Sequence, residues 1–528
     1  MIYLALAILM APVAWWLAQD RAVWLWDQSW YGEVSTDLWF YASHFSLREW
    51  ATAMIYEMNL KPPGVVWIGQ FFVPLHALFG DIENALLVSV LVTQALLLWT
   101  IYKIGEALKP AHSWTPFVGV IFAAATQSFV GLSHQFMVEP LQALAVAWVV
   151  LIAAKVDEWP GARILVHLAA ATLLGALAKL TTPAYCLLFY PYIAYRMFML
   201  RSLRPWREMF SSEWSRISSR LVIVLFALIV PVTALWYTLN AKAVWQHARD
   251  SASGEIALAY GFRGSFFQKL LVWTGLLNQT ILSPYLAWTL ALACVAALLY
   301  FPFQTRAALF TLSLAQIAIV LALFSLADAV ESRYLYALIV FVSISVTVLC
   351  SSTPRGALLF LVLVPCAVQW SFTNNAASGR PTSRSSVSPL LIAADPGTVH
   401  YQELTRIVAL TSNARGRYNV VGVEEPWLNA NGASFFAAKQ RLATGIRSFY
   451  TSLGYAEKDA AVALKRLDDL NTHYLITLDE QHQNAAPNFL NAVSLSVLKA
   501  IRQDPRYRQL DFPSTQGVLI FERQSDHP

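Results

Sequence analysis

Long apolar runs dominate the first 373 residues of the chain and leave little room for polar positions between them. An α-helix needs roughly 17–25 mostly apolar residues to cross a bilayer. Eleven runs approach this length, with centres near residues 10, 94, 122, 146, 171, 191, 230, 292, 317, 343 and 365. The pattern therefore predicts an α-helical polytopic membrane protein with about 11 transmembrane helices.

The residues after Thr373 follow a different pattern. A stretch rich in Ser, Asn and Gly over 374–389 predicts a linker, and no later apolar run reaches membrane length. Short runs beyond it predict strands at Tyr418–Val423, Tyr474–Leu478 and Val518–Phe521, and helices at Ala433–Leu442 and Asp459–Leu470. We therefore expect a transmembrane module over 1–373 and a soluble α/β domain over 390–528.

Composition supports this division. Charged residues make up about 19% of the last 155 residues and only about 10% of the first 373, whereas soluble domains average roughly 25%. The formal net charge of +5 is spread along the chain without a block of Lys and Arg, which argues against nucleic-acid binding. The four cysteines lie in apolar runs without metal-ligand spacing, so they are expected to be small core residues.

Basic residues in the short loops predict the orientation, because Lys and Arg are enriched on the cytoplasmic side of a membrane. One side collects Lys103, Lys109, Lys155, Arg163, Arg306, Arg355 and the cluster from Arg196 to Arg220. With that side cytoplasmic, the outer loop 24–83 and the C-terminal domain face the periplasmic or extracellular side of the cytoplasmic membrane. The apolar stretch Lys61–Phe79 is expected to be a helix at the outer interface, because a span there would move the Arg196–Arg220 cluster outside.

Ionisable residues gather in the outer loop. Asp27 follows the first apolar run, Tyr31 and Glu33 come next, and the loop continues to Lys61-Pro62-Pro63. Charged groups near membrane depth are costly, so they are candidates for function. Asp27, Tyr31 and Glu33 do not share one helical face, which predicts a loop that wraps around a pocket. The structural alternatives are that Asp27 caps a helix at the interface and that Lys61 extends its amine to the membrane surface.

Two further groups follow along the chain. Glu139 precedes a proline at the outer start of an apolar run, and the sequence from Glu331 to Tyr334 contains an Arg-Tyr pair. Glu139 could instead complement a helix dipole, and Arg333 could form a structural ion pair with Glu331 or Asp328. Four other residues on the predicted outer side are expected to be structural, namely His134, Lys179, His247 and Arg263.

Together these motifs resemble the polyprenyl-phosphate-dependent membrane glycosyltransferases of the GT-C fold, the superfamily of protein O-mannosyltransferases and lipid A aminoarabinose transferase. In chain order the matching residues are Asp27-x-x-x-Tyr31-x-Glu33, Lys61-Pro62-Pro63, Glu139 and Arg333-Tyr334. The chain departs from the family at Gln28, where an acidic residue usually follows the aspartate, and at Trp30, which differs from the aminoarabinose branch. These departures leave the acceptor open.

The resemblance implies an inverting glycosyltransferase that moves a sugar from a polyprenyl-phosphate-linked donor to an extracytoplasmic acceptor, either lipid A, a polysaccharide or a protein. A carboxylate can act as general base on the acceptor hydroxyl, and fixed cations can stabilise the leaving phosphate. We therefore expect Asp27 to be catalytic. Substrate-binding roles are expected for Tyr31, Glu33, Lys61, Glu139, Arg333 and Tyr334. Neither a metal nor a cofactor is expected.

Two other classes of protein compete with this interpretation. A transporter or flippase for a lipid-linked saccharide would be expected to carry ionisable residues near the middle of several spans, whereas here they cluster at the outer ends. A non-enzymatic assembly or sensor protein would leave the set Asp27, Lys61, Glu139 and Arg333 without a role.

Overall fold

The structure, a computed structural model, describes residues 1–108, 110, 112–201, 217–254, 257–258, 260–300, 307–351, 357–379, 387–412, 417–483 and 489–524. Several predicted features lie outside these ranges: Lys109, Arg204, Arg207, Arg216, Arg306, Arg355 and residues 380–386 of the linker. The chain divides into two compact units. The helical unit comprises Met1–Ala18, Met58–Val65 and Leu87–Ala393, and the mixed unit comprises Gln19–Glu57, Val66–Leu86 and Ala394–Pro528.

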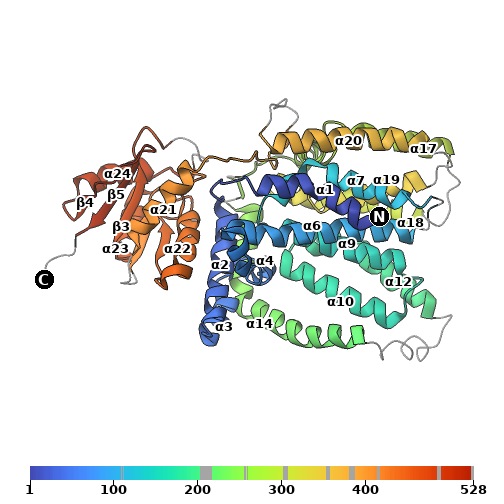
Figure 1. Ribbon diagram of the computed structural model, residues 1–528, viewed down its shortest axis with the longest axis horizontal. Coiled ribbons are helices and arrows are strands. Elements are labelled where there is room, and N and C mark those ends of the chain that lie inside the picture. The colour runs from blue at the N-terminus through green and yellow to red at the C-terminus, as the bar shows by residue number, and fades with distance from the viewer. Residues whose placement is uncertain are drawn as a thin grey trace. The chain divides into compact units, whose positions relative to one another are not determined.

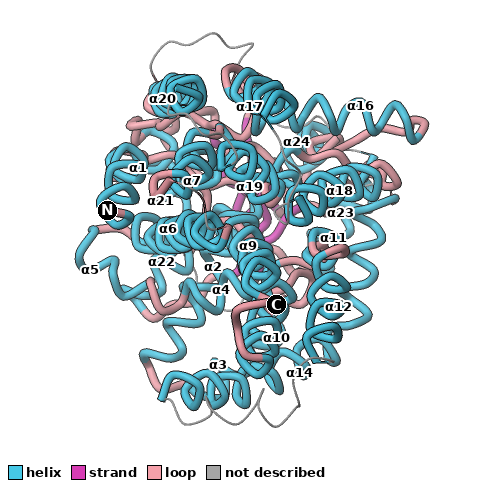
Figure 2. Tube along the Cα trace, turned by 90° about the vertical axis from the view of Figure 1, so that its right-hand side faces the viewer, coloured by secondary structure: helices cyan, strands magenta, loops and turns pink. Residues whose placement is uncertain are grey.

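Apolar helices make up the helical unit, and each of the eleven predicted centres falls within a helix. The helices are α1 (Ile2–Leu17), α6 (Ile82–Ala107), α7 (Thr115–Ala125), α8 (Gln127–Ser133), α9 (Glu139–Lys155), α10 (Gly161–Ala178), α11 (Thr182–Tyr185), α12 (Phe189–Arg201), α14 (Ile217–Ser253), α16 (Phe266–Leu277), α17 (Leu286–Tyr300), α18 (Ala307–Phe324), α19 (Leu338–Ser351) and α20 (Ala357–Ala377), with short turns η2 (Asn278–Leu282) and η3 (Ser332–Leu335). Figures 1 and 2 view α6, α7 and α9 from directions 90° apart, and together they show that the axes of these helices are roughly aligned with one another.

Three of the described helical segments are long and apolar enough to cross a membrane: Ile82–Ala107, Gly161–Ala178 and Ser332–Ser351. The pair α7 and α8, bent by 65°, would make a fourth if it is one broken span. Two shorter apolar helices, Ile2–Leu17 and Ala308–Phe324, accompany them. The predicted number of eleven spans therefore stays a prediction, although every predicted position is helical.

Helix α19 forms the centre of the helical unit, because each of its residues from Leu338 to Ser351 is buried. Its sequence is apolar on all sides, apart from small Ser and Thr residues, which is typical of a helix surrounded by other helices. It packs against α7, α9, α17 and α18. The Arg333-Tyr334 pair lies in η3, directly before this central helix, so its backbone is anchored to a fully buried element of the unit.

The mixed unit joins the outer-loop residues to the C-terminal residues. Its helices are α2 (Trp26–Ser43), α3 (Leu47–Tyr56), η1 (Val73–Leu75), α5 (His76–Phe79), α21 (Val399–Thr411), α22 (Ala430–Thr444), α23 (Ala460–Asp469) and α24 (Ser494–Gln503), and α4 (Gly64–Gly69) begins in the helical unit. The predicted helix over Lys61–Phe79 is thus broken into α4, η1 and α5. Pro74 sits at the start of η1, where it cannot donate the amide hydrogen bond that a continuous helix requires.

A five-stranded sheet lies within the mixed unit, with the strand order β2-β1-β3-β5-β4. The strands are β1 (Tyr418–Val421), β2 (Phe449–Ser452), β3 (Tyr474–Leu478), β4 (Tyr507–Gln509) and β5 (Val518–Arg523). Strand β1 pairs in parallel with β2 and β3, whereas β5 pairs antiparallel with β3 and β4. The α/β character and three of these strands agree with the prediction from sequence, and β2 and β4 were not predicted.

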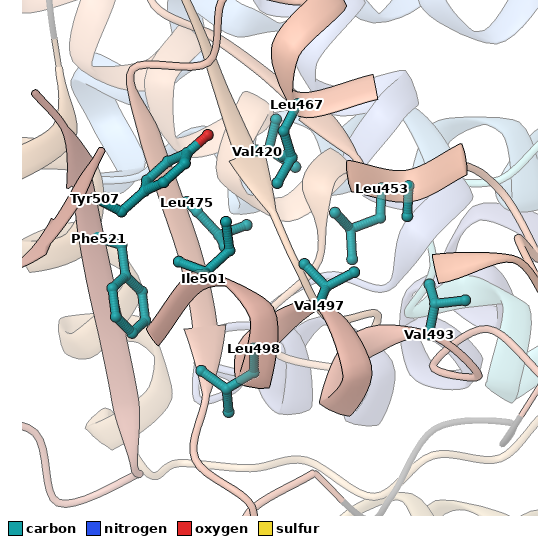
Figure 3. Close-up of a cluster of buried hydrophobic side chains, with 11 residues drawn as sticks. Val420, Leu453, Leu467, Leu475, Val493, Val497, Leu498, Ile501, Tyr507 and Phe521 are labelled. Carbon is teal, nitrogen blue, oxygen red and sulfur yellow. The ribbon is translucent and has the colours of Figure 1, made fainter. Parts of the chain in front are cut away.

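Successive residues of β1 point to opposite faces of the sheet. Val420 enters a buried cluster with residues of α23 and α24, including Leu467 and Ile501 (Figure 3). Its neighbour Asn419 instead donates a hydrogen bond from Nδ2 to the carbonyl oxygen of Thr411, at the end of α21 (2.9 Å). One face of the sheet is therefore covered by α23 and α24, and the other faces α21 and α22.

Helix α2 packs along α22. A Cβ atom on Gly32 of α2 would lie 2.9 Å from the ring of Phe435 in α22, so glycine allows this close approach. Residues 26–43, which the sequence predicts as a loop around a pocket, are therefore a regular helix. The prediction was wrong here because α2 buries polar residues such as Ser29, Ser35 and Thr36 along with apolar ones, and so has no clear apolar face.

Candidate active site

Glu139 lies at the centre of a charged cluster in the helical unit. It is the first residue of α9, and its side chain is only 1% exposed. The Nζ atom of Lys179, the residue that ends α10, lies 2.7 Å from Oε1 of Glu139. Each charge also complements the dipole of its own helix, since Glu139 begins one helix and Lys179 ends another. The ion pair therefore joins two helices that pack side by side.

Arg333 adds a second cation to this cluster. Its Nε lies 3.8 Å from Oε1 of Glu139 and also donates a hydrogen bond to the carboxylate of Glu331. Lys179 Nζ lies over the ring of Tyr334, 4.0 Å from its centre. Two of the residues predicted from sequence, Arg333 and Glu139, thus meet in space although they are far apart in the chain. The Arg333–Glu331 pair that the sequence analysis kept as an alternative is also present.

The second oxygen of Glu139 faces a buried environment without a hydrogen-bond partner among the described residues. Most buried polar atoms in proteins are satisfied, so an unsatisfied one at a cluster of charges marks a place where a further polar group can bind. A hydroxyl group could donate a hydrogen bond to this oxygen. The cluster can therefore hold an anion at its two cations and a hydroxyl at its buried carboxylate.

Lys61 lies in the helical unit, a few residues after the end of α3, which belongs to the mixed unit. The segment that contains it is held close to the end of α10: a Cβ on Gly64 would lie 2.6 Å from the carbonyl oxygen of Leu177. Leu177 is two residues before Lys179, so Gly64, which ends the Lys-Pro-Pro-Gly sequence, packs beside the end of α10. Lys61 itself is half-buried.

Asp27 lies in the first turn of α2, in the mixed unit. The helix N-cap is Leu25, which has no capping side chain, so the half-buried Asp27 supplies the negative charge that a helix N-terminus favours. Tyr31 follows one turn later on the same side and is 2% exposed. The position of Asp27 in the first turn of α2 is compatible with the capping alternative.

Glu33 faces away from Asp27, as its spacing predicts, and joins a buried cluster of carboxylates and arginines. Burial, and then the charges of Asp37 and Glu57, raises the pKa of Glu33 well above its ordinary value. Asp37 pairs with Arg441 (2.9 Å), and Glu57 pairs with Arg447 (3.0 Å). This cluster holds α2 and α3 against the end of α22 and the residues that follow it, and Glu33 belongs to it through the charges of Asp37, Glu57 and Arg447.

Burial also raises the pKa of Glu57 to about 7, with a further contribution from the charge of Asp37, although Arg447 opposes the shift. The same cause raises the pKa of Asp37 despite two neighbouring arginines. With three carboxylates and two guanidinium groups, the cluster is balanced when one carboxylate holds a proton. The mixed unit therefore contains a buried protonation site near neutral pH.

Sequence reasoning missed four participants in these two units, namely Lys179, Arg441, Arg447 and Glu424. Lys179 was expected to be structural, yet its Nζ lies closer to the Glu139 carboxylate (2.7 Å) than Nε of Arg333 does (3.8 Å). Arg441 and Arg447 lie hundreds of residues beyond their partners, so no local pattern connects them with α2. Glu424, which follows β1, accepts a hydrogen bond from the indole of Trp26 beside Asp27 (2.9 Å). The Glu-Glu-Pro-Trp sequence directly after a predicted strand could have marked Glu424 as a candidate site residue.

No family model and no curated protein matches the chain in sequence. Solved structures match its fold. ArnT from Cupriavidus metallidurans, solved bound to undecaprenyl phosphate, aligns with a TM-score of 0.59 at 13% identity over 98% of this chain and 97% of ArnT. The arabinofuranosyltransferase AftD from Mycobacteria aligns with a TM-score of 0.52 at 14% identity over 99% of this chain and 40% of AftD.

The archaeal oligosaccharyltransferase AglB from Archaeoglobus fulgidus, solved with an inhibitory peptide and a dolichol-phosphate, aligns with a TM-score of 0.50 at 10% identity. That alignment covers 99% of this chain and 74% of AglB. Alignments of this extent include both compact units, and identities this low establish fold rather than activity. The chain therefore has the GT-C fold of these glycosyltransferases, as its sequence motifs predicted.

Proposed function

We propose that this protein is an inverting glycosyltransferase that takes a sugar from a polyprenyl-phosphate-linked donor and transfers it to an extracytoplasmic acceptor. The observation that carries the proposal is the likeness, over 98% of the chain, to a structure of ArnT that holds undecaprenyl phosphate. The acceptor is a lipid, a polysaccharide or a protein with a free hydroxyl or equivalent nucleophile.

The charged cluster of the helical unit supports a role at the donor phosphate. Lys179 and Arg333 are two cations that share the buried carboxylate of Glu139, and Arg333 also pairs with Glu331. A phosphate near them would gain charge-assisted hydrogen bonds, and Lys61 would add a third cation from the segment beside α10. Tyr334, under the amine of Lys179, fixes that side chain through its ring. Such fixed cations stabilise the negative charge that develops on the leaving phosphate.

Asp27 is the proposed general base, and Tyr31 and Glu33 are proposed to support substrate binding from α2. In the reaction, the acceptor oxygen forms a bond to the anomeric carbon while the bond from that carbon to the phosphate oxygen breaks. The acceptor proton passes to the Asp27 carboxylate, and the electron pair of the broken bond leaves with polyprenyl phosphate. A single displacement of this kind inverts the anomeric configuration.

The proposed setting is the cytoplasmic membrane. Eleven spans would place the N-terminus inside, and the outer loop 24–83 and the C-terminal residues outside. Support comes from the three long apolar helices and from the fold shared with ArnT and AglB. In this setting the donor lipid reaches the active site from the outer leaflet and the acceptor arrives from the aqueous side.

The decisive experiment uses the purified full-length protein with a panel of polyprenyl-phosphate sugars, with and without a cell-envelope extract as the source of acceptor. Release of polyprenyl phosphate that depends on the extract is expected for at least one donor. Nucleotide sugars serve as the negative control. If the donor crosses a vesicle membrane intact and no polyprenyl phosphate is released, the protein is instead a flippase, the alternative that the sequence left open.

Asp27→Asn is the first variant to test. Its folding and donor binding should be retained, whereas transfer should fall by at least about a hundredfold, the usual scale for loss of a general base. Glu49→Gln is the matched control, because Glu49 is an exposed carboxylate in α3 of the same unit. Near-normal turnover of the Asp27 variant would remove the assignment of the base while leaving the transferase proposal intact.

A further inference from the structure

Glu424 occupies a position that the proposed reaction does not yet use. It follows β1, where parallel strands end, and is 8% exposed. Its Oε2 accepts a hydrogen bond from Nε1 of Trp26 (2.9 Å). Trp26 is the first residue of α2 and directly precedes Asp27. A buried carboxylate from the C-terminal residues thus holds the side chain next to the proposed catalytic base, within one compact unit.

Several contacts fix this arrangement. Asn431 donates a hydrogen bond from Nδ2 to the backbone oxygen of Trp26 (3.2 Å). Trp24 stacks on Phe435, with ring centres 5.2 Å apart. The backbone amide of Glu424 itself donates to Oδ1 of Asn491 (2.7 Å). The N-cap residue of α2, Leu25, makes no capping hydrogen bond, so these contacts from residues after 423 add to the bond from Ser29 Oγ to the Trp24 carbonyl oxygen (2.6 Å) in holding the start of the helix.

The carboxylate is costly at this position. Burial raises the pKa of Glu424 to about 7, and the Trp26 hydrogen bond only partly opposes this shift. A glutamine could accept the same indole hydrogen bond without the cost of burying a charge. An ionised acceptor, however, makes a shorter and stronger hydrogen bond than an amide does. The residue type thus suits a contact that has to hold the indole in one place.

We propose that Glu424 is a positioning residue that, through Trp26, sets the direction of Asp27 at the start of α2. This inference rests on the proposed function, since it takes Asp27 as the base. It makes the C-terminal residues part of the catalytic machinery, because one of their carboxylates orients the first turn of α2. Displacement of a reacting group by about 1 Å can cost as much as a hundredfold in rate, so a contact of this kind has a measurable effect.

The test compares Glu424→Ala, Trp26→Phe, the double variant and Glu424→Gln in the full-length protein. The first two should each lower kcat by about ten- to a hundredfold with little change in KM for the donor. The double variant should be no worse than either single one, because both remove the same contact. Glu424→Gln should recover most of the loss, since its amide oxygen still accepts the bond. Glu480→Ala, at an exposed carboxylate paired with Arg502, is the control.

Hydrogen exchange of the peptide over residues 24–31 provides a readout that does not need activity. Exchange should rise in Glu424→Ala and Trp26→Phe and stay unchanged in Glu480→Ala. Full kcat in folded Trp26→Phe, multiplying losses in the double variant, or raised exchange with unchanged kcat would each overturn the inference. If the wild-type protein transfers no sugar, the proposed function fails, and unchanged exchange in the variants would then separately overturn the positioning contact.

Discussion

Glu139 shows how much a single buried carboxylate can determine. One of its oxygens lies near two cations, and the other has no hydrogen-bond partner among the described residues. Breaking a buried ion pair by removing one partner typically costs about 3–5 kcal/mol, because the remaining charge is left unpaired. Glu139 is therefore expected to be needed for stability as well as for the geometry of Lys179 and Arg333.

Glu139→Gln should lower the melting temperature of the protein in detergent. Addition of undecaprenyl phosphate should then raise the melting temperature of this variant more than that of the wild type, because the phosphate replaces the missing negative charge beside the two cations. Glu331→Gln serves as the comparison, since Glu331 is more exposed, at 23%, and should give a smaller loss. An equal ligand effect in the variant and the wild type would argue against a phosphate at this cluster.

The contributions of Lys61 and Arg333 to donor binding can be distinguished by replacing each residue in turn. Replacement of either by Met should weaken binding of a polyprenyl-phosphate analogue by about tenfold or more, as expected for loss of a charge-assisted hydrogen bond of about 1.5–3 kcal/mol. Arg333→Met should have the larger effect, because it also leaves the carboxylates of Glu331 and Glu139 without this partner. Unchanged affinity in both folded variants would mean that neither residue contacts the donor phosphate.

The partners of these residues explain what the sequence could not reveal. The Lys179–Glu139 pair spans 40 residues, and the Trp26–Glu424 pair spans 398. Hydropathy and local motifs identify a carboxylate at a helix start, but they do not tell which distant cation meets it. No local pattern connects Arg333 with Glu139, although Nε of Arg333 lies 3.8 Å from Oε1 of Glu139, and only the family resemblance linked the two residues.

Among the elements, α2 and α3 form a packing interface that depends on protonation. Their carboxylates Glu33, Asp37 and Glu57 meet Arg441 and Arg447 in the mixed unit. The pKa of Glu57 rises to about 7 from an ordinary value of 4.5, so the folded state binds a proton more tightly than the unfolded chain does. Stability from this group is present at low pH and is lost as the pH rises from about 4.5 through about 7.

Glu57→Gln should make the melting temperature less dependent on pH between about 5 and 8 than it is in the wild type. Above pH 7 the variant should be at least as stable, because burial affects the pKa of Glu57 more than the attraction of Arg447 does. Glu49→Gln, in the same helix α3 region but exposed, should leave the pH dependence unchanged. Identical slopes for the Glu57 variant and the wild type would contradict this account.

Element positions followed from sequence wherever one physical signal dominated. Apolar runs located a helix at each of the eleven predicted centres, and short strand-like runs located β1, β3 and β5. Helix α2 was missed because both polar and apolar residues of α2 are buried, many of them against α22. Its sequence therefore shows no separate apolar face. Strands β2 (Phe449–Ser452) and β4 (Tyr507–Gln509) were missed because each is short and contains polar residues, so neither forms an apolar run.

At the scale of the whole molecule, the predicted orientation can be tested without any assay of activity. Single cysteines replacing Ser43 and Thr444, both exposed in the mixed unit, should react with an impermeant thiol reagent in intact cells or spheroplasts. The background should lack Cys186, Cys294, Cys350 and Cys366. A cysteine replacing Glu106, at the end of α6, should react only after lysis. The reverse pattern would place the proposed active site on the cytoplasmic side and remove the donor chemistry proposed for it.

The division of the chain between its two units has a consequence for biosynthesis. The mixed unit takes its first two segments from residues 19–57 and 66–86 and its remainder from residues after 393. During synthesis, α2 with its acidic side chains therefore emerges from the ribosome long before Arg441 and Arg447 are translated. The apolar helices between them are made while α2 still lacks its partner α22. A premature stop codon near residue 393 would consequently remove more than a tail, since it would leave α2, the helix that carries Asp27, without its packing partner α22.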